Sequence, residues 1–209
     1  MANISKIRGF TPVKHTNGSP YNGQANIYFV PASDGTALFV GDPVKLLADA
    51  NAQGVQQVTK ATAGAAVLGV VVGVINTKLD PIAGGMTGGS ISIDTPVYRP
   101  ASTGQYVLVC DSPDVVYEVE ASTGANAAYS FAVADVGLNA DLTTVAGSTT
   151  TGTSAASLNM AGAANTATLQ WKILGVVQRP DNEITGQYTK VLVKINNAQM
   201  GAGTGTAGV

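Results

Sequence analysis

Residues 66–75 read AVLGVVVGVI, an almost uninterrupted apolar run in which valine predominates. Its length and β-branched side chains favour a strand over a helix, and the lack of polar alternation predicts a strand buried on both faces. Gly69 and Gly73 interrupt the run where a sheet bends or bulges, as at the corners of a barrel. Left exposed, this stretch would promote aggregation, so the remainder of the chain must cover it.

Short apolar or alternating segments recur on both sides of this run, with turn residues between them. They occupy residues 25–30, 37–40, 44–47, 54–60, 90–98, 106–110, 115–120, 127–133, 169–178 and 188–195. Strands spaced by about 8–12 residues with turn signals between them predict an all-β barrel or sandwich, a β-tulip-like variant included. Helix signals are weak. The best candidate covers residues 44–52 and begins at Asp42-Pro43, so we expect at most one or two short helices.

Two neighbouring strand segments are expected to form a hairpin. They are residues 106–110 and 115–120, which are joined by a turn sequence at residues 111–114. The second segment alternates, which predicts an apolar inner face and an outer face on which Glu118 and Glu120 are solvated.

A five-residue pattern occurs twice, as VLGVV at residues 67–71 and as ILGVV at residues 173–177. Five residues are weak support for a duplication. We expect two strands with equivalent roles, each with a glycine where its sheet bends.

Composition divides the chain into three parts. Residues 1–24 hold two prolines and two Asn-Gly turns and predict an extended N-terminal arm, which is either a disordered terminus or a partner-binding segment. Residues 25–200 predict a single β domain with an insertion rich in small residues at about 121–167. Within it, residues 143–156 are a loop, a flexible hairpin or a subunit contact. Residues 201–209 predict a flexible tail.

Composition also argues against several functional classes. Only 11% of the 209 residues are charged while 45% are hydrophobic, and the net charge of −2 gives no electrostatic basis for binding nucleic acid. No apolar run approaches the ~18 residues that cross a bilayer, and the N-terminus lacks a secretory signal. The single Cys110 fits synthesis in a reducing cytoplasm. A soluble chain with so few charges is expected to need a partner protein over part of its surface.

Residue types that carry chemistry are scarce. His15 is the only histidine and Cys110 the only cysteine, too few for a zinc site. Since His15 lies in the arm, where we expect a solvent-exposed or interface role, we expect Cys110, at the end of a strand, to be a buried structural thiol and not a nucleophile. The stretch GGMTGG at residues 84–89 lacks the Gly-Lys-Ser/Thr end of a phosphate-binding loop. We therefore expect no catalytic, metal or cofactor-binding residues, no small-molecule substrate and no enzyme activity. The lone Trp171 is either a core anchor or an interface hot spot.

Several of these segments together resemble head decoration (cement) proteins of tailed double-stranded DNA phages. The likeness is carried by ALFVGDPVKL at residues 37–46 with VLGVVVGV at 67–74, by YVLVCD at 106–111 with DVVYEV at 114–119, and by ILGVVQRPDNE at 173–183. The resemblance implies a virion protein, made in the host cytoplasm, that binds the outer surface of the mature head and stabilises contacts between capsomers. It implies the major capsid protein as a partner, and self-association as a homotrimer or a dimer.

The N-terminal arm is the segment that we expect to contact the capsid. An extended chain can add a strand to a partner through backbone hydrogen bonds, while side chains add specificity. The expected contact residues are Ile4, Lys6, Ile7, Arg8, Phe10, Val13 and Lys14. The alternatives are another virion component, such as a tail tube or head fibre protein, and a carbohydrate-binding β module.

Overall fold

The computed structural model of the protein describes residues 3–75 and 96–200. These residues form an all-β fold whose only helices are two 3-10 turns, η1 (Gly124–Asn126) and η2 (Val133–Asp135). The expected all-β class is therefore confirmed.

Some sequence predictions fall outside the described residues or are wrong. The glycine-rich loop at 84–89, most of the strand expected at 90–98 and the tail at 201–209 lie outside the described residues. The helix expected at 44–52 is wrong, because most of that segment is a strand. Residues 37–40 form only isolated bridges.

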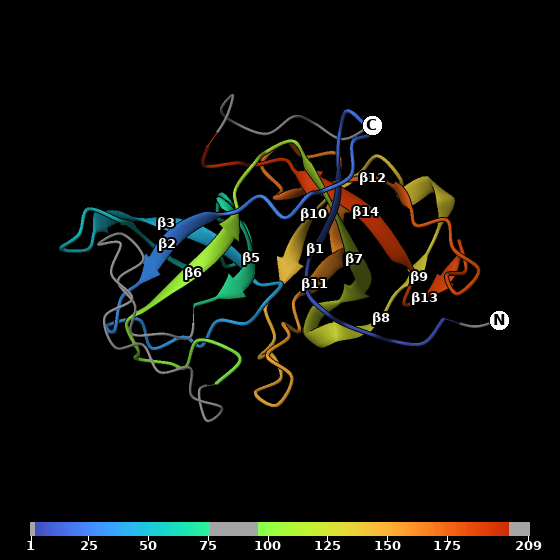
Figure 1. Ribbon diagram of the computed structural model, residues 1–209. Coiled ribbons are helices and arrows are strands. Elements are labelled where there is room, and N and C mark those ends of the chain that lie inside the picture. Colours follow the sequence, from blue (N-terminus) through green and yellow to red (C-terminus); the bar gives the residue numbers. More distant parts are fainter. Residues whose placement is uncertain (1–2, 76–95, 201–209) are drawn as a thin grey trace.

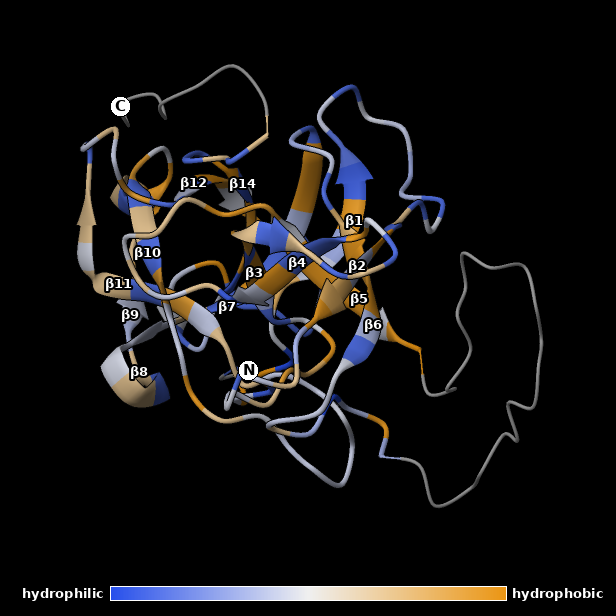
Figure 2. Ribbon diagram, turned by 90° about the vertical axis from the view of Figure 1, so that its left-hand side faces the viewer, coloured by the Kyte–Doolittle hydropathy of each residue, from blue (hydrophilic) through white to orange (hydrophobic). Residues whose placement is uncertain are grey.

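Five strands close a first barrel, barrel 1, at the left of Figure 1. They are β2 (Asn26–Val30), β3 (Pro43–Ala50), β4 (Gln56–Lys60), β5 (Gly69–Val74) and β6 (Gln105–Cys110). Neighbours follow the order β2-β4-β3-β5-β6, and β6 pairs with β2 to close the ring. Val44, Val58, Val71 and Val107 point inward and are fully buried. In Figure 2, parts of β2 and β5 are orange because their residues are hydrophobic.

A second barrel, barrel 2, lies beside the first (Figure 1). Its strands are β7 (Val115–Thr123), β10 (Asn139–Thr143), β11 (Ser157–Ala164), β12 (Trp171–Val176) and β14 (Lys190–Ile195). They pair in the order β7-β11-β10-β12-β14, and the pairing of β14 with β7 closes the ring. Outside the ring, β1 (Thr11–His15) and β8 (Ala127–Ala128) pair with β7. A separate small sheet joins β9 (Ser130–Phe131) to β13 (Gly186–Gln187).

Two predictions about the middle of the chain are corrected. The segment 121–167 is no insertion beside the fold, because it supplies β10 and β11, whose Leu142 and Leu158 are buried in the core of barrel 2. Residues 144–156 between them form the expected loop. The predicted hairpin is wrong, because β6 belongs to barrel 1 and β7 to barrel 2. Its turn sequence leads the chain from one barrel to the other.

The two barrels share one topology. With the five ring strands of each barrel numbered along the chain, both rings close in the order 1-3-2-4-5. In both, the first and third strands are parallel, β2 with β4 and β7 with β11. All the other ring pairs are antiparallel. Positions in one barrel can therefore be matched to positions in the other.

The strand registers agree as well. In barrel 1 the ladder between β5 and β6 is bulged just before Gly73, which pairs with Leu108. In barrel 2 the ladder between β12 and β14 is bulged just before Gly175, which pairs with Leu192. Each leucine is the centre of a Val-Leu-Val triplet. The bulge and its partner thus occupy the same place in both barrels.

A glycine turn precedes the second strand of each barrel. Gly41 and Gly137 both have a φ of +96°, a conformation that favours glycine. The Gly41 amide donates to the Val71 carbonyl (2.7 Å) and the Gly137 amide donates to the Ile173 carbonyl (3.0 Å). Both acceptors lie two residues before the bulged glycine. These turn hydrogen bonds therefore give the same alignment of the two barrels as the strand registers do.

The short sequence repeat lies on equivalent strands, β5 and β12, but four residues out of step. Matching residues 67–71 with 173–177 aligns Gly69 with Gly175, whereas the ladders align Gly73 with Gly175. Gly69 has a different role, since a Cβ there would overlap the Cys110 carbonyl. In sequence, VLGVV at residues 67–71 shares four of five residues with ILGVV at 173–177, whereas VVGVI at residues 71–75 shares two, so sequence alone favours the alignment that the ladders do not show.

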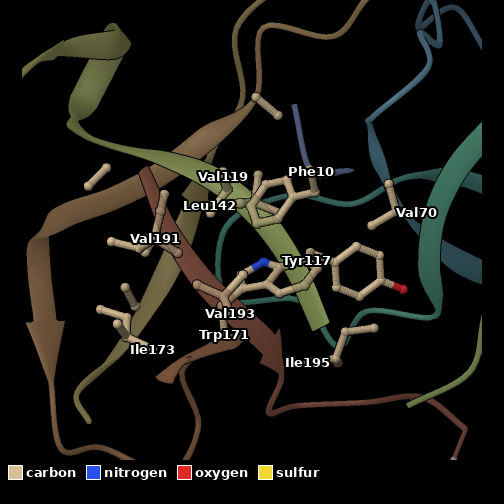
Figure 3. Packing of buried hydrophobic residues seen from close by; sticks show 14 of the residues in the cluster. Phe10, Val70, Tyr117, Val119, Leu142, Trp171, Ile173, Val191, Val193 and Ile195 are labelled. Carbon is tan, nitrogen blue, oxygen red and sulfur yellow. The ribbon is translucent and has the colours of Figure 1, made fainter. Parts of the chain in front are cut away.

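An aromatic cluster fills the centre of barrel 2 (Figure 3). The fully buried Trp171 stacks on Phe10 with ring centroids 4.2 Å apart, and the ring of Tyr117 meets it edge-on at 5.5 Å. The expectation that Trp171 anchors the core is confirmed.

Buried polar contacts hold the two barrels together. Asp42, immediately before β3 of barrel 1, accepts a hydrogen bond from the Ser154 hydroxyl of barrel 2 (2.5 Å) and is paired within barrel 1 to Lys60 of β4 (3.0 Å). From barrel 2, the side-chain amide of Gln170 donates to two carbonyls in the turn at residues 62–65 (2.8 and 2.6 Å). Each of these contacts also satisfies a polar group that is removed from water.

Candidate partner-binding site at the N-terminal segment

The N-terminal segment, residues 3–15, is bound to the body of the protein along its length. Its last part forms β1, which pairs with β7 of barrel 2. Before β1, the Phe10 amide donates to the Gly41 carbonyl of barrel 1 (2.9 Å). Gly9 has a φ of +73°, and a Cβ there would overlap that same carbonyl. The segment therefore passes tightly between the two barrels before it reaches its strand.

Phe10 is the clearest correction to the expected contact residues. It is 1% exposed and packs on Trp171, so it belongs to the core and is not available to a partner. The sequence does not show whether a single phenylalanine in an extended arm packs in the core of its own chain or against a partner.

The first residues of the segment are held by a buried carboxylate. Glu120 on β7 accepts hydrogen bonds from the Ser5 hydroxyl (2.8 Å) and from the Lys6 amide (2.7 Å). Its 4% exposure contradicts the solvated face expected for it. Asn3 adds two bonds to the backbone of Glu183, donating to its carbonyl (3.1 Å) and accepting from its amide (2.6 Å). The arm is thus a fixed part of barrel 2's surface.

The remaining predicted contact residues differ in accessibility. Ile4 is 70% exposed and Val13 41% exposed. The side chains of Lys6, Arg8 and Lys14 are exposed as well, while Ile7 is half-buried. Six of the seven expected residues therefore remain open to a partner to some degree.

Lys6 and Arg8 line a surface pocket of about 410 Å³. The N-terminal segment, β7, the start of β14 and the turn at 179–181 form its walls. The other lining residues are Gly9, Thr11, Glu118, Val119, Glu120, Arg179, Asp181 and Lys190. Val13 and Lys14 do not line the pocket, because they lie on β1 beyond its bulge.

A salt-bridge group forms one side of the pocket. The Arg179 guanidinium donates to both carboxylate oxygens of Glu118 (2.9 and 2.8 Å) and to Asp181 (3.1 Å). The hydrogen bonds from Arg179 to Glu118 raise the pKa of the guanidinium. For Asp181, desolvation acts to raise the carboxyl pKa, but attraction by Arg179, hydrogen bonds and attraction by Lys190 together outweigh it and lower that pKa. The pocket therefore contains charges of both signs.

Sequence reasoning missed the acidic and C-terminal members of this pocket. The alternation of residues 115–120 predicts a solvated face for Glu118 and Glu120, and residues 179–181 lie between two predicted strands. The one usable signal was the alternation along residues 115–120, which places both glutamates on one face. Alternation does not reveal what covers that face, and here the cover comes from residues more than 100 positions away.

The two candidate nucleophile and base residues lie elsewhere. Cys110 is 1% exposed and accepts a hydrogen bond from the Tyr117 hydroxyl at its sulfur (3.5 Å). Burial raises the pKa of its thiol. His15 lies on β1, where its ring is tilted against Tyr21 at 6.4 Å. The expected buried role of Cys110 is confirmed.

The Cys110 thiol should be protected from modification in the folded protein. Because the thiolate is the reactive form and burial disfavours it, we expect labelling by a disulfide reagent at pH 8 to be at least about 100-fold slower than in urea. Absorbance of the released thiol measures both rates. Comparable rates in the two conditions would contradict the buried placement.

No group of three or more potential metal ligands occurs among residues 3–75 and 96–200. No helix in this part of the chain is long and apolar enough to span a membrane.

Comparison with protein-family models, with curated proteins and with solved structures returns no match. Function must therefore be argued from the residues of this chain.

Glu120 should control the order of the N-terminal segment. Glu120→Ala removes the acceptor of Ser5 and Lys6, a loss of about 1–3 kcal/mol of local stabilisation. We expect trypsin to cleave after Lys6 and Arg8 at least about tenfold faster, since 1.4 kcal/mol corresponds to a factor of ten in the open population. Mass spectrometry of the time course measures this. Glu183→Ala, an exposed carboxylate whose side chain bonds nothing in the segment, is the matched control; equal cleavage in both variants would contradict the prediction.

Proposed function

We propose that this protein is a head decoration protein of a tailed phage, which binds the outer surface of the mature capsid and stabilises contacts between capsomers. The sequence resemblance suggests this function, and the chemistry of the chain is consistent with it. The observation that carries the proposal is the fixed N-terminal segment, which displays Ile4, Lys6 and Arg8 outward while its backbone is bound.

A preformed contact segment favours binding. Fixing the backbone of one flexible residue costs roughly 1–2 kcal/mol. Here the hydrogen bonds of Glu120 and Asn3 hold the backbone before any partner arrives. Binding energy is then available for contacts with the shell, and many weak copies on one shell stabilise it together.

Apolar side chains accompany the basic ones. Ile4 and Ile184 are 70% and 45% exposed, and each directly follows one member of the hydrogen-bonded pair Asn3 and Glu183. An interface needs such apolar anchors within a polar rim. The same exposed groups also suit self-association, and we propose a homotrimer, with a dimer as the alternative.

Co-sedimentation with expanded, empty heads of the virus that encodes the chain tests the proposal. The wild type is expected to sediment with the heads, and the double variant Ile4→Asp, Lys6→Glu is expected to bind at least about tenfold more weakly. The control is Val97→Asp with Lys45→Glu, which makes the same changes outside the N-terminal segment. Failure of the wild type to bind heads would reject the decoration role. Equal binding of both variants would reject the segment as the contact.

Electron microscopy separates this function from the other virion roles. A tail tube protein would assemble into stacked rings without a shell, whereas a decoration protein should remain a small oligomer in solution. Rings formed by the purified chain would favour the tail tube.

A further inference from the structure

The pocket beside the N-terminal segment carries charges that the barrel itself does not require. In the matched positions of barrel 1, residues on the outer face are apolar or aromatic. Leu192 pairs with Glu118 in barrel 2, and its equivalent Leu108 pairs with Ile27 in barrel 1. The two barrels therefore share the same strand pairing here, although barrel 2 has a charged residue where barrel 1 has an apolar one.

The next pair along the strands shows the same contrast. Glu120 pairs with Lys190 in barrel 2, and the equivalent pair in barrel 1 is Phe29 with Tyr106. Those two rings pack edge-on, with centroids 5.1 Å apart. Since barrel 1 closes with aromatic residues at these positions, the glutamate and lysine of barrel 2 serve a purpose beyond folding of the ring.

The carboxylates of the pocket are already used within the chain. Both oxygens of Glu118 accept from Arg179. Both oxygens of Glu120 accept from the N-terminal segment, at Ser5 and Lys6. Neither glutamate forms an ion pair with another cation among the described residues.

Three cationic side chains of the pocket are left without an ion pair. Lys6, Arg8 and Lys190 form no salt bridge within 4.0 Å in the part of the chain that the structure describes. Lys190 is the decisive one, because it is only 9% exposed. Its ammonium attracts Asp181 but lies more than 4.0 Å from that carboxylate. A bound anion would supply a counter-ion at ion-pair distance, which no described residue provides.

We propose that this pocket binds the carboxylate of an acidic side chain from a partner polypeptide, with Lys190 and Arg8 as its counter-ions. The lining residues comprise four cations and three anions, which leaves one positive charge for a monoanion. The three carboxylates would repel a doubly charged phosphate. A planar carboxylate also matches the paired donors of an arginine.

The identity of the partner rests on the proposed function. If the chain decorates a capsid, the acidic residue belongs to the shell protein and lies close to the apolar contact of Ile4. The carboxylate site itself follows from the pocket and does not depend on that role.

Titration with a small carboxylate tests the site on the full chain. N-acetylglutamate, at low salt, is expected to shift the amide signals of Lys190 and Arg8 saturably, with a dissociation constant of about 1–10 mM. Lys190→Met should weaken this binding at least about tenfold, while Lys194→Met, an outward lysine on the same strand that does not line the pocket, should leave it unchanged. The uncharged N-acetylglutamine should produce no saturable shift.

Three results would overturn the proposal. They are equal weakening by both lysine variants, binding of N-acetylglutamine, and tighter binding of inorganic phosphate than of N-acetylglutamate. Head co-sedimentation separates this site from the function. If Lys190→Met binds heads as the wild type does, the carboxylate contact with the shell is wrong and the decoration role stands. If N-acetylglutamate binds but heads do not, the site stands and the decoration role is wrong.

Discussion

Replacement of Asp42 by alanine is expected to lower the free energy of unfolding by about 3–5 kcal/mol. The Asp42 carboxylate is fully buried and accepts hydrogen bonds from the Phe39 amide (3.0 Å) and the Ser154 hydroxyl (2.5 Å). It also pairs with Lys60, whose side chain is only 10% exposed (3.0 Å). The substitution leaves this lysine as an uncompensated buried charge and disconnects the loop of barrel 2 from barrel 1.

Urea unfolding followed by circular dichroism measures the effect. Asp114→Ala is the matched control, because this exposed aspartate has no side-chain bond among the described residues, and it should change stability by less than about 0.5 kcal/mol. The double variant Asp42→Ala, Lys60→Met should recover part of the loss, since it removes the orphaned charge. A loss below about 1 kcal/mol for Asp42→Ala would contradict the buried ion pair.

Replacement of Phe10 by alanine should be similarly damaging, at about 3–5 kcal/mol. Phe10 is 1% exposed and stacks on Trp171, so its removal leaves a cavity in the centre of barrel 2. The same urea experiment measures the loss, and Phe10→Leu should cost less because it refills part of the space. Val13→Ala, 41% exposed on the same segment, should remain within about 0.5 kcal/mol of wild type. Equal stabilities of Phe10→Ala and Val13→Ala would reject the core assignment.

The core position of Phe10 determines how the N-terminal segment should be tested. Deletion of residues 1–20 would remove both Phe10 and β1. If such a deletion abolished binding, the cause could be either a damaged barrel 2 or the loss of the contact residues, and the experiment would not distinguish them. Point substitutions at Ile4 and Lys6 change the surface and leave these anchors in place.

The sequence predicts where most strands lie, but it does not predict which strands pair with one another. Residues 25–30, 54–60 and 188–195 contain strands within one or two residues of the expected bounds, because β-branched alternation is a local signal. Pairing is a property of the whole chain. The adjacent segments at 106–110 and 115–120 therefore looked like a hairpin although they belong to different barrels.

The candidate site was predictable only in part. The exposed basic and apolar residues Ile4, Lys6 and Arg8 were found, because an unbalanced basic arm is visible in sequence. Burial of Glu120 and Lys190 could not be found, since both depend on a cover that folds back from the N-terminus and from the turn at 179–181. Period-two patterns identify the two faces of a strand but not the segment that lies over either face.

The path of the N-terminal segment has a consequence for biosynthesis. Phe10 leaves the ribosome about 160 residues before its stacking partner Trp171. Barrel 1 can close while translation continues, whereas barrel 2 cannot complete its core until β14 has emerged. Docking of the N-terminal segment is therefore a late step, and until then the nascent chain carries an unprotected aromatic side chain.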